Sequence, residues 1–549
     1  MQYNYIRGVR VEKNIFTNGK KARKVEKEFL RLGVALIFMV GVMWWSSTEF
    51  GDVSNNLFLV IAAVFGAYMA LNIGANDVAN NVGPAVGAGA MTLTTAIFIA
   101  AIFEAGGAII AGGDVVSTIK KGIIDPTMFV SPDEFVWAMT AALFSAALWL
   151  NIATYFRAPV STTHSIVGGV MGAGIAAAGF SIVAWGTMGK IALSWIISPV
   201  LGGIIAALFL FFIKESILNK EDKLESAKKI APYLVSIMAW AFGTYLVLKG
   251  LKKVWPSIVD TFTFLPDTKK PTFLVAVILG LIIAGIVFII VKPLVTTAIR
   301  KLKNNRASVN TLFTIPLIFA AALLSFAHGA NDVANAVGPL AAIYDTIVSG
   351  DISGTKASIP LWVMLIGAIG IAIGLLLYGP RLIKTVGNEI TELDATRAYS
   401  IAMASALTVI IASQLGLPVS TTHIAIGGVF GVGFLREYLA HKRRDNLLAE
   451  ENKVVNSSKT KIRTLSAELE TLESTIEDRD YKKISEIQHS LQAEQSELDS
   501  ANKNIKEIIE ANYIQKSFVS KIISAWVITV PVAAVISALI FFVIRGMMV

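Results

Sequence analysis

Long apolar runs separated by short polar segments recur along most of this chain. Several of them, alone or with their flanks, reach the about 20 residues that a helix needs to cross a bilayer. The pattern therefore predicts an all-helical polytopic membrane protein with about 12 membrane segments, re-entrant ones included. The apolar runs occupy residues 34–45, 57–73, 94–112, 136–156, 190–213, 231–248, 272–291, 311–327, 360–379, 399–415 and 521–544.

Composition supports a membrane class. Charged residues make up 16% of the chain and its mean hydropathy is +0.64, whereas soluble proteins carry roughly a quarter charged residues. Residues 1–29 are polar and basic with no apolar core, so we expect no cleavable signal peptide. The chain has no cysteine, which excludes disulfides, thiolate metal sites and cysteine nucleophiles.

Basic residues collect in particular loops. They cluster in residues 1–29, 214–229 and 292–306, whereas the segment around Glu49 and Asp52 has no basic residue. Because lysine and arginine favour cytoplasmic loops, this predicts a cytoplasmic N-terminus in a multi-pass protein of the plasma membrane, which is the inner membrane in a bacterium. The net charge of +9 reflects these loops, and we expect a lipid bilayer and no nucleic acid as partner.

Two motifs occur twice. "GANDVANNVGP" begins at Gly74 and "GANDVANAVGP" begins at Gly329. "APVSTTHSIVGGVMGAG" begins at Ala158 and "LPVSTTHIAIGGVFGVG" begins at Leu417. The same order of both motifs predicts two homologous halves.

A third pair of similar apolar segments, beginning at Lys190 and Lys521, extends the halves to about 57–213 and 311–545. By charge, the first half begins outside and ends inside, and the second does the reverse. The halves are therefore predicted to be inverted repeats, an architecture of secondary transporters with the substrate site near the midplane, although channels can share it.

The remaining segments lie outside these repeats. Residues 436–518 contain no Gly or Pro, and apolar residues spaced by three and four from Ile462 and again from Ile484 predict an antiparallel coiled-coil hairpin in the cytoplasm. It could be a spacer or oligomer contact, or a regulatory element. The other added helices carry no polar residue that suggests a function. The predicted organisation is 1–29 basic N-terminus, 30–56 extra helix and external loop, 57–213 repeat 1, 214–310 linker with two extra helices, 311–435 first part of repeat 2, 436–518 hairpin, and 519–549 last helix of repeat 2.

Asp77 and Asp332 lie in apolar surroundings, where an ionised carboxylate costs about 3 kcal/mol. Neighbouring glycines and prolines predict a broken helix at both copies, which frees backbone carbonyls around a cavity. With adjacent amide oxygens these groups predict a site for a hard cation: sodium at Asp77 and at Asp332, or a proton on either. The alternative is a buried helix–helix hydrogen bond. The amides are those of Asn76, Asn80, Asn331 and Asn335.

The hydroxyl motifs have the opposite preference. In each, a proline suits the first turn of a new helix, whose free N–H groups and positive dipole end attract an anion. They predict an oxyanion site, with helix capping alone as the alternative. The hydroxyls are those of Ser161, Thr162, Thr163, Ser420, Thr421 and Thr422.

Cation and anion motifs together predict a cotransporter for a small oxyanion, in which cations bind first because they offset the carboxylates. Glu104 is a further acid in an apolar run; it could hold the coupling ion, accept the hydrogen of a phosphate P–OH group, or pair with Lys120 or Lys121. Arg157 could assist the anion or lie at the interface. We find no zinc spacing, phosphate loop or nucleophilic triad, and so expect neither an enzyme nor a cofactor.

The doubled motifs resemble those of the inorganic phosphate transporter (PiT) family. The resemblance implies a homodimeric carrier with two inverted domains that moves phosphate with sodium or protons. It also implies that Asp77, Asp332 and Glu104 are essential acids and that the six hydroxyls contact phosphate. Animal relatives carry a glutamate where Ala402 stands, which bears on the coupling ion. Two alternatives stay open: a sulfate:cation symporter, and a membrane phosphate sensor signalling through 436–518.

Overall fold

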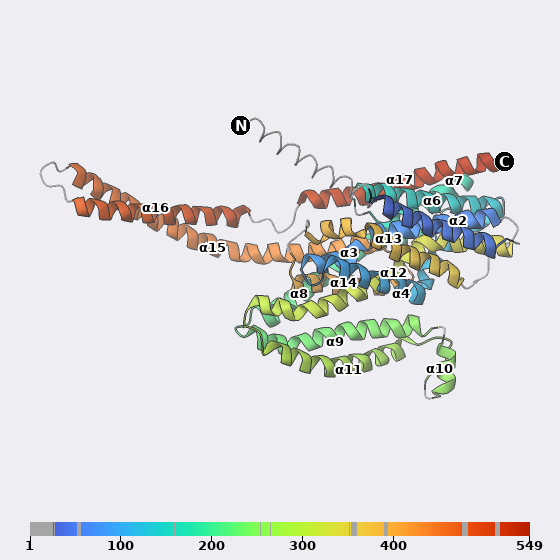
Figure 1. Cartoon of the computed structure of the whole chain (residues 1–549), viewed down its shortest axis with the longest axis horizontal. Helices are drawn as coiled ribbons and strands as arrows, with labels where there is room; N and C mark the ends of the chain where they lie inside the picture. Colours follow the sequence, from blue (N-terminus) through green and yellow to red (C-terminus); the bar gives the residue numbers. More distant parts are fainter. Residues whose placement is uncertain are drawn as a thin grey trace, which may run out of the picture. The chain divides into compact units, whose positions relative to one another are not determined.

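The computed structural model describes the chain as helices joined by turns (Figure 1). Within the described residues there is no strand, only an isolated bridge between Ile124 and Val183. In the part of the chain that the structure describes, eleven helices are long and apolar enough to cross a membrane, and each predicted apolar run coincides with one of them. The prediction of an all-helical polytopic protein is confirmed. The described residues are 26, 28–51, 56–156, 158, 160–252, 254–263, 265–350, 352, 359–388, 393–474, 481–510 and 516–549.

The helices of the repeats and the added helices follow one another along the chain. After a first helix over Glu28–Glu49, they are α2 (Asn56–Asn76), α3 (Ala79–Gly87), α4 (Leu93–Ala111), α5 (Gly113–Lys121), α6 (Pro132–Tyr155), α7 (Thr162–Ala178), α8 (Trp185–Ile213), α9 (Lys223–Gly250), α10 (Trp255–Thr261), α11 (Phe273–Ile299), α12 (Arg306–Ser349), α13 (Leu361–Asn388), α14 (Ala395–Gln414), α15 (Thr421–Ser474), α16 (Tyr481–Glu510) and α17 (Lys516–Met548).

The first GANDVAN motif breaks its helix. α2 ends at Asn76 and α3 begins at Ala79, with Asp77 in the turn between them. Here the backbone N–H of Asn80 donates over 3.0 Å to the carbonyl of Asp77, three residues earlier, whereas an α-helix joins residues four apart. Nδ2 of Asn80 donates to the same carbonyl over 2.9 Å. The side chain thus stabilises a carbonyl that the turn exposes.

The second GANDVAN motif does not break its helix. α12 continues through the motif and Pro339, so the expected second break is wrong. The physical difference lies in the amide of Asn335, which donates to the hydroxyls of Thr162 and Thr163 rather than to a carbonyl of its own helix. Without that competing donor, the backbone bonds of α12 persist.

The hydroxyl motifs lie at the tips of two helical hairpins. α6 and α7 form the first, and α14 with the start of α15 forms the second, and each packs against the last helix of the other half. Gly172 of α7 lies against the backbone of Ala534 in α17, and Gly431 of α15 lies against the backbone of Gly203 in α8. Glycine permits this close approach because a Cβ atom would overlap with the neighbouring carbonyl.

The outer ends of the hairpins contact different ends of the second half. Glu134 at the start of α6 pairs with Arg545 at the end of α17 over 3.7 Å. Asp394 before α14 pairs with Arg306 at the start of α12 over 2.7 Å. The inversion of the two repeats stays a prediction.

The central and C-terminal insertions are helical too. α9 and α11 pack side by side (Figure 1). Residues Gly433–Gln515 form a separate unit in which α15 and α16 run antiparallel, as the pairs Lys461–Glu494 and Lys483–Glu468 require. The described residues of the predicted seam are buried or half-buried. A supercoil and a role for this hairpin stay predictions.

We predict that Gly172→Ala destabilises the protein, because the added methyl group meets a backbone carbonyl of α17 that cannot move as a side chain can. The expected cost is about 1–3 kcal/mol, read as a lower midpoint of thermal unfolding in detergent. Gly189→Ala is the control, since nothing lies within 4 Å of its added Cβ. Equal effects of the two substitutions would contradict the packing described here.

Candidate functional site

The two hairpins bring the four motifs to one buried place. Asp77 comes from the turn between α2 and α3, Asp332 from the middle of α12, and the hydroxyls from the first residues of α7 and α15. Every predicted site residue is at most 1% exposed. The segments on which these residues lie are far apart in sequence, so their convergence is a property of the fold.

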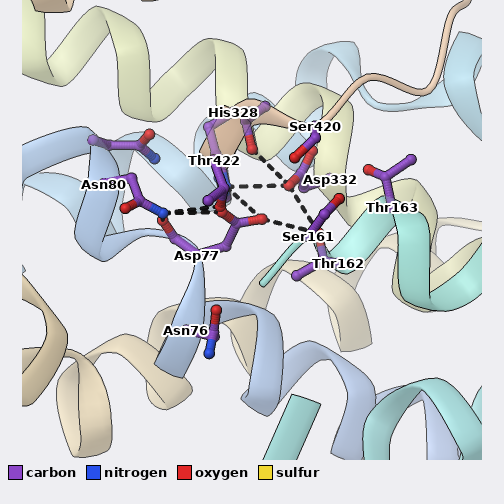
Figure 2. Close-up of polar contacts among 12 residues, drawn as sticks. Asn76, Asp77, Asn80, Ser161, Thr162, Thr163, His328, Asp332, Ser420 and Thr422 are labelled. Carbon is purple, nitrogen blue, oxygen red and sulfur yellow. Dashed lines mark hydrogen bonds and ion pairs between the residues drawn. The ribbon is translucent and has the colours of Figure 1, made fainter. Parts of the chain in front are cut away.

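Thr162 lies between the two carboxylates (Figure 2). Its Oγ1 is 2.9 Å from Oδ2 of Asp77 and 3.1 Å from Oδ2 of Asp332. Thr421 donates to the same Oδ2 of Asp332 over 2.9 Å. The predicted cation and anion groups are therefore not two separate sites, because hydroxyls of the anion motifs hydrogen-bond the carboxylates of the cation motifs.

Two asparagines link each half to the hydroxyls of the other. Nδ2 of Asn80 is 3.3 Å from Oδ1 of Asp77 and donates to Thr422 Oγ1 over 2.9 Å. Nδ2 of Asn335 donates to Thr162 Oγ1 over 3.0 Å. The amide oxygens of both asparagines and Oδ1 of Asp332 are buried without a hydrogen-bond partner in the structure. Buried oxygens of this kind are ligands for a hard cation.

Asn76 and Asn331 hold the hairpin tips. Asn76 donates to the Ala158 carbonyl over 3.1 Å and accepts from the N–H of Val160 over 3.3 Å. Asn331 donates to the Leu417 carbonyl over 3.3 Å, and its Oδ1 is buried without a partner. The oxygen of Asn76 thus already accepts a hydrogen bond, whereas that of Asn331 has no partner in the structure, and cation binding by either stays a prediction.

The serines cap the helices that carry the hydroxyls. Oγ of Ser161 accepts from the N–H of His164 over 3.1 Å, and Oγ of Ser420 accepts from that of His423 over 3.2 Å. Capping uses the oxygen and leaves each O–H group able to donate to an anion. Thr163 donates to the Val419 carbonyl over 2.9 Å. Arg157 and Pro159 lie outside the described residues.

Glu104 reaches the site through a histidine that sequence reasoning missed. Its Oε2 is 2.7 Å from Nδ1 of His328, whose Nε2 is 3.2 Å from Oδ2 of Asp332 and 3.8 Å from Oδ2 of Asp77. One imidazole thus lies among three buried acids. The ligand atoms of Asp77, His328 and Asp332 lie within 4.8 Å of one another, a spacing that could hold a metal ion. Lys120 pairs with Asp345 rather than with Glu104.

The acid network takes Glu104 from the first half and His328 from the second, and it has no symmetric copy among the described residues. Gly329 packs against the carbonyl of Glu104, and the matching Gly74 packs against the carbonyl of Ile371, so these two positions correspond. Oε1 of Glu104 accepts from Asn81 over 2.8 Å. The two GANDVAN motifs differ at one position, which is Asn81 in the first copy and Ala336 in the second. The site is therefore symmetric in its aspartates and hydroxyls and asymmetric in Glu104, Asn81 and His328.

Comparison with known proteins identifies the family. A model of the phosphate transporter family matches residues 73–537. The chain belongs to the phosphate transporter family. Over 541 residues it is 46% identical to a protein of Helicobacter pylori strain J99 named "Putative phosphate permease", covering 96% of this chain and 98% of that protein. A Pyrococcus abyssi protein with the same description is 40% identical over 378 residues, which are 69% of this chain and 89% of that protein.

A solved structure of a family relative has the same fold. It is described as the sodium-dependent phosphate transporter, is 31% identical to this chain, and superposes with a TM-score of 0.68. The similarity covers 89% of this chain and 99% of that one. The family resemblance that the motifs predicted is therefore confirmed.

We predict that Asn81→Ala lowers the unfolding midpoint, because Glu104 loses a buried hydrogen-bond donor at a cost of about 1–3 kcal/mol. The same substitution should cost much less in a Glu104→Ile background, since isoleucine is the residue at the corresponding position 371. Thermal unfolding of the two single variants and the double variant measures the coupling. An equal loss in both backgrounds would show that the Asn81 amide does not act through Glu104.

Proposed function

We propose that this protein is a secondary active symporter that imports inorganic phosphate with sodium. The observation that carries the proposal is the position of Thr162, whose hydroxyl lies at hydrogen-bond distance from both Asp77 and Asp332 at the start of a helix. Helix starts with hydroxyls bind oxyanions, and carboxylates bind cations. Membership of the phosphate transporter family supports phosphate as the anion.

Electrostatics explains the coupling. A phosphate anion at the hydroxyls would lie beside two buried carboxylates, and two like charges about 4 Å apart repel by about 4 kcal/mol at an effective dielectric of 20. A cation on each aspartate removes that repulsion. It also takes the place of the hydroxyl at the carboxylate, so Thr162 and Thr421 can donate to phosphate instead. Cations therefore bind first.

Sodium fits this site better than a proton. A proton on either aspartate would need no further ligand, whereas the buried oxygens of Asn80, Asn331 and Asn335 lack partners and suit a metal cation. The related solved structure is that of a sodium-dependent transporter. A proton remains the alternative coupling ion for the test below.

Phosphate is favoured over sulfate by Glu104. This acid is hydrogen-bonded to Nδ1 of His328, whose Nε2 faces Asp332, so through the imidazole it can accept the hydrogen of a P–OH group, which sulfate lacks. Sulfate is therefore the competing substrate in the test below.

A membrane phosphate sensor is the weaker alternative, because a sensor has no need of complete cation and anion groups in both halves.

We propose the orientation that the basic loops predict, with the N-terminus in the cytoplasm. The two central basic loops lie together, since the N–H of Lys223 donates to Asn304 over 2.8 Å. The start of the second hairpin, Asp394, pairs with Arg306 in the same region. The first hairpin then enters from outside and the second from inside, as alternating access between inverted halves requires. The assembly is the homodimer that the family resemblance implies.

Uptake of radiolabelled phosphate into proteoliposomes tests this function. An inward sodium gradient should drive accumulation, and a proton gradient alone should not. Excess sulfate should leave the rate unchanged. Asp77→Asn and Asp332→Asn should each lower driven uptake by about 100-fold or more, because each removes the charge that holds a cation. Asp260→Asn, at an exposed acid of α10, is the matched control.

Full activity of either site variant would reject the cation role at that position. Accumulation driven by a proton gradient without sodium would show that the coupling ion is the proton. Inhibition by sulfate would show that sulfate competes for the substrate site. Phosphate that equilibrates but never accumulates under any gradient would reject the symporter.

A further inference from the structure

The tip of the second hairpin is held by helices outside its own hairpin. The side chain of Thr118 on α5 donates to the Gly416 carbonyl over 2.7 Å, and Trp195 on α8 donates to the Pro418 carbonyl over 3.2 Å. Nζ of Lys249, at the end of α9, lies 3.4 Å from the Ser413 carbonyl. Together with Asn331, these contacts fix the tip from several sides.

Lys249 is the unexpected member, because α9 belongs to neither repeat. It is only 8% exposed and forms an ion pair with Asp114 at the start of α5. Burial by itself would raise the pKa of Asp114, but its hydrogen bonds with Lys249 and Lys252 hold the pKa below the usual value. The Asp114 carboxylate is therefore charged at neutral pH, and its ion pair with Lys249 joins α9 to α5 over the tip.

The same contacts lead directly to the cation site. Ser413, whose carbonyl lies beside Lys249, accepts at its hydroxyl from Nδ2 of Asn331 over 3.1 Å. Asn331 precedes Asp332 and has a buried amide oxygen without a partner. α5 is itself tied to α12 by the Lys120–Asp345 pair. Two contacts, Lys249–Ser413 and Ser413–Asn331, thus lead from Lys249 to the residue that precedes Asp332.

The corresponding tip of the first hairpin has fewer such contacts. Ala158 matches Leu417 by position in the repeat, and Asn76 of α2 contacts it as Asn331 contacts Leu417. Among the described residues of that tip, no contact from another helix matches those of Thr118 and Lys249. The adjoining Tyr155 is 78% exposed. Within the described part of the two tips, the ties to α5 and α9 therefore belong to the second tip.

We propose that Asp114, Lys249 and Thr118 form a latch that closes the site on the side of the second hairpin tip. The buried site can open toward that side only when the tip leaves α5 and α9, which breaks the Lys249–Ser413 and Thr118–Gly416 contacts. In the orientation proposed above this is the external side, so the latch rests on that proposal. Lys249 is then a positioning residue for transport, contributed by a helix outside the repeats.

Single cysteines can report on the latch, because the chain has none of its own. Leu417→Cys marks the second tip, and Ala158→Cys marks the matching position of the first. We would measure the labelling rate of each by a membrane-impermeant maleimide, from outside in intact cells and from inside in inverted vesicles, with the full chain. Lys249→Met and Asp114→Asn each break the ion pair.

Each latch variant should raise the external labelling rate of Leu417→Cys by about fivefold to tenfold and lower the internal labelling rate of Ala158→Cys. Opposite shifts are expected because the state closed at the second tip loses a stabilising ion pair, which favours the state open there. Lys252→Met is the matched control. Lys252 contacts Asp114 over 2.9 Å but is exposed and does not reach Ser413, so its loss should change neither rate.

Unchanged labelling in Lys249→Met would overturn the latch, as would an equal rise at both tips, which indicates general loosening. If Lys249→Met does not reach the membrane, Thr118→Val tests the same closure through the Gly416 contact and should give the same opposite shifts. These rates do not depend on phosphate transport. Shifted labelling in a protein that shows no sodium-driven uptake would therefore reject the proposed function and support the latch. Sodium-driven uptake with unchanged labelling would support the proposed function and reject the latch.

Discussion

The structure depends on two carboxylates that are buried side by side among the membrane helices. Asp77 and Asp332 share the hydroxyl of Thr162, and neither is exposed to water by more than 1%. Burying one such charge is expensive, and burying two side by side adds their repulsion. Hydroxyls of the capped hairpin helices donate to both carboxylates, whereas the unpartnered amide oxygens beside them can only be satisfied by a donor or a cation. This is why we propose that an anion enters the site only together with cations.

The departures from symmetry give the site a direction. The repeats supply equal aspartates and hydroxyls, but Glu104 and Asn81 come from the first half alone and His328 from the second half alone. Ile371 of the second half stands at the position that matches Glu104, and Ile73 of the first half at the position that matches His328. A purely symmetric site would have the same chemistry when it faces either side. The third acid and the ion pair at Lys249 are therefore the features that can make the two faces unequal.

The sequence predicted the helices and the main site residues because both depend on local or repeated signals. Apolar runs gave the membrane helices, and the letters shared by both motifs identified Asp77, Asp332 and their hydroxyl partners. His328 was missed because it stands just before the repeated motif, where the first copy has isoleucine. A lysine near the end of an apolar helix is also typical of an interface, so nothing local marked Lys249. The continuity of α12 depends on the hydrogen bonds of Asn335 to another helix, which no local pattern reports.

In the proposed mechanism, cations occupy the carboxylates before phosphate binds. Equilibrium binding of radiolabelled phosphate to the purified protein, with sodium varied against choline at constant ionic strength, measures this order. We expect the phosphate Kd to fall by about tenfold or more as sodium rises, and sodium to bind more tightly by the same factor when phosphate is present. A phosphate Kd that does not change with sodium concentration would contradict it.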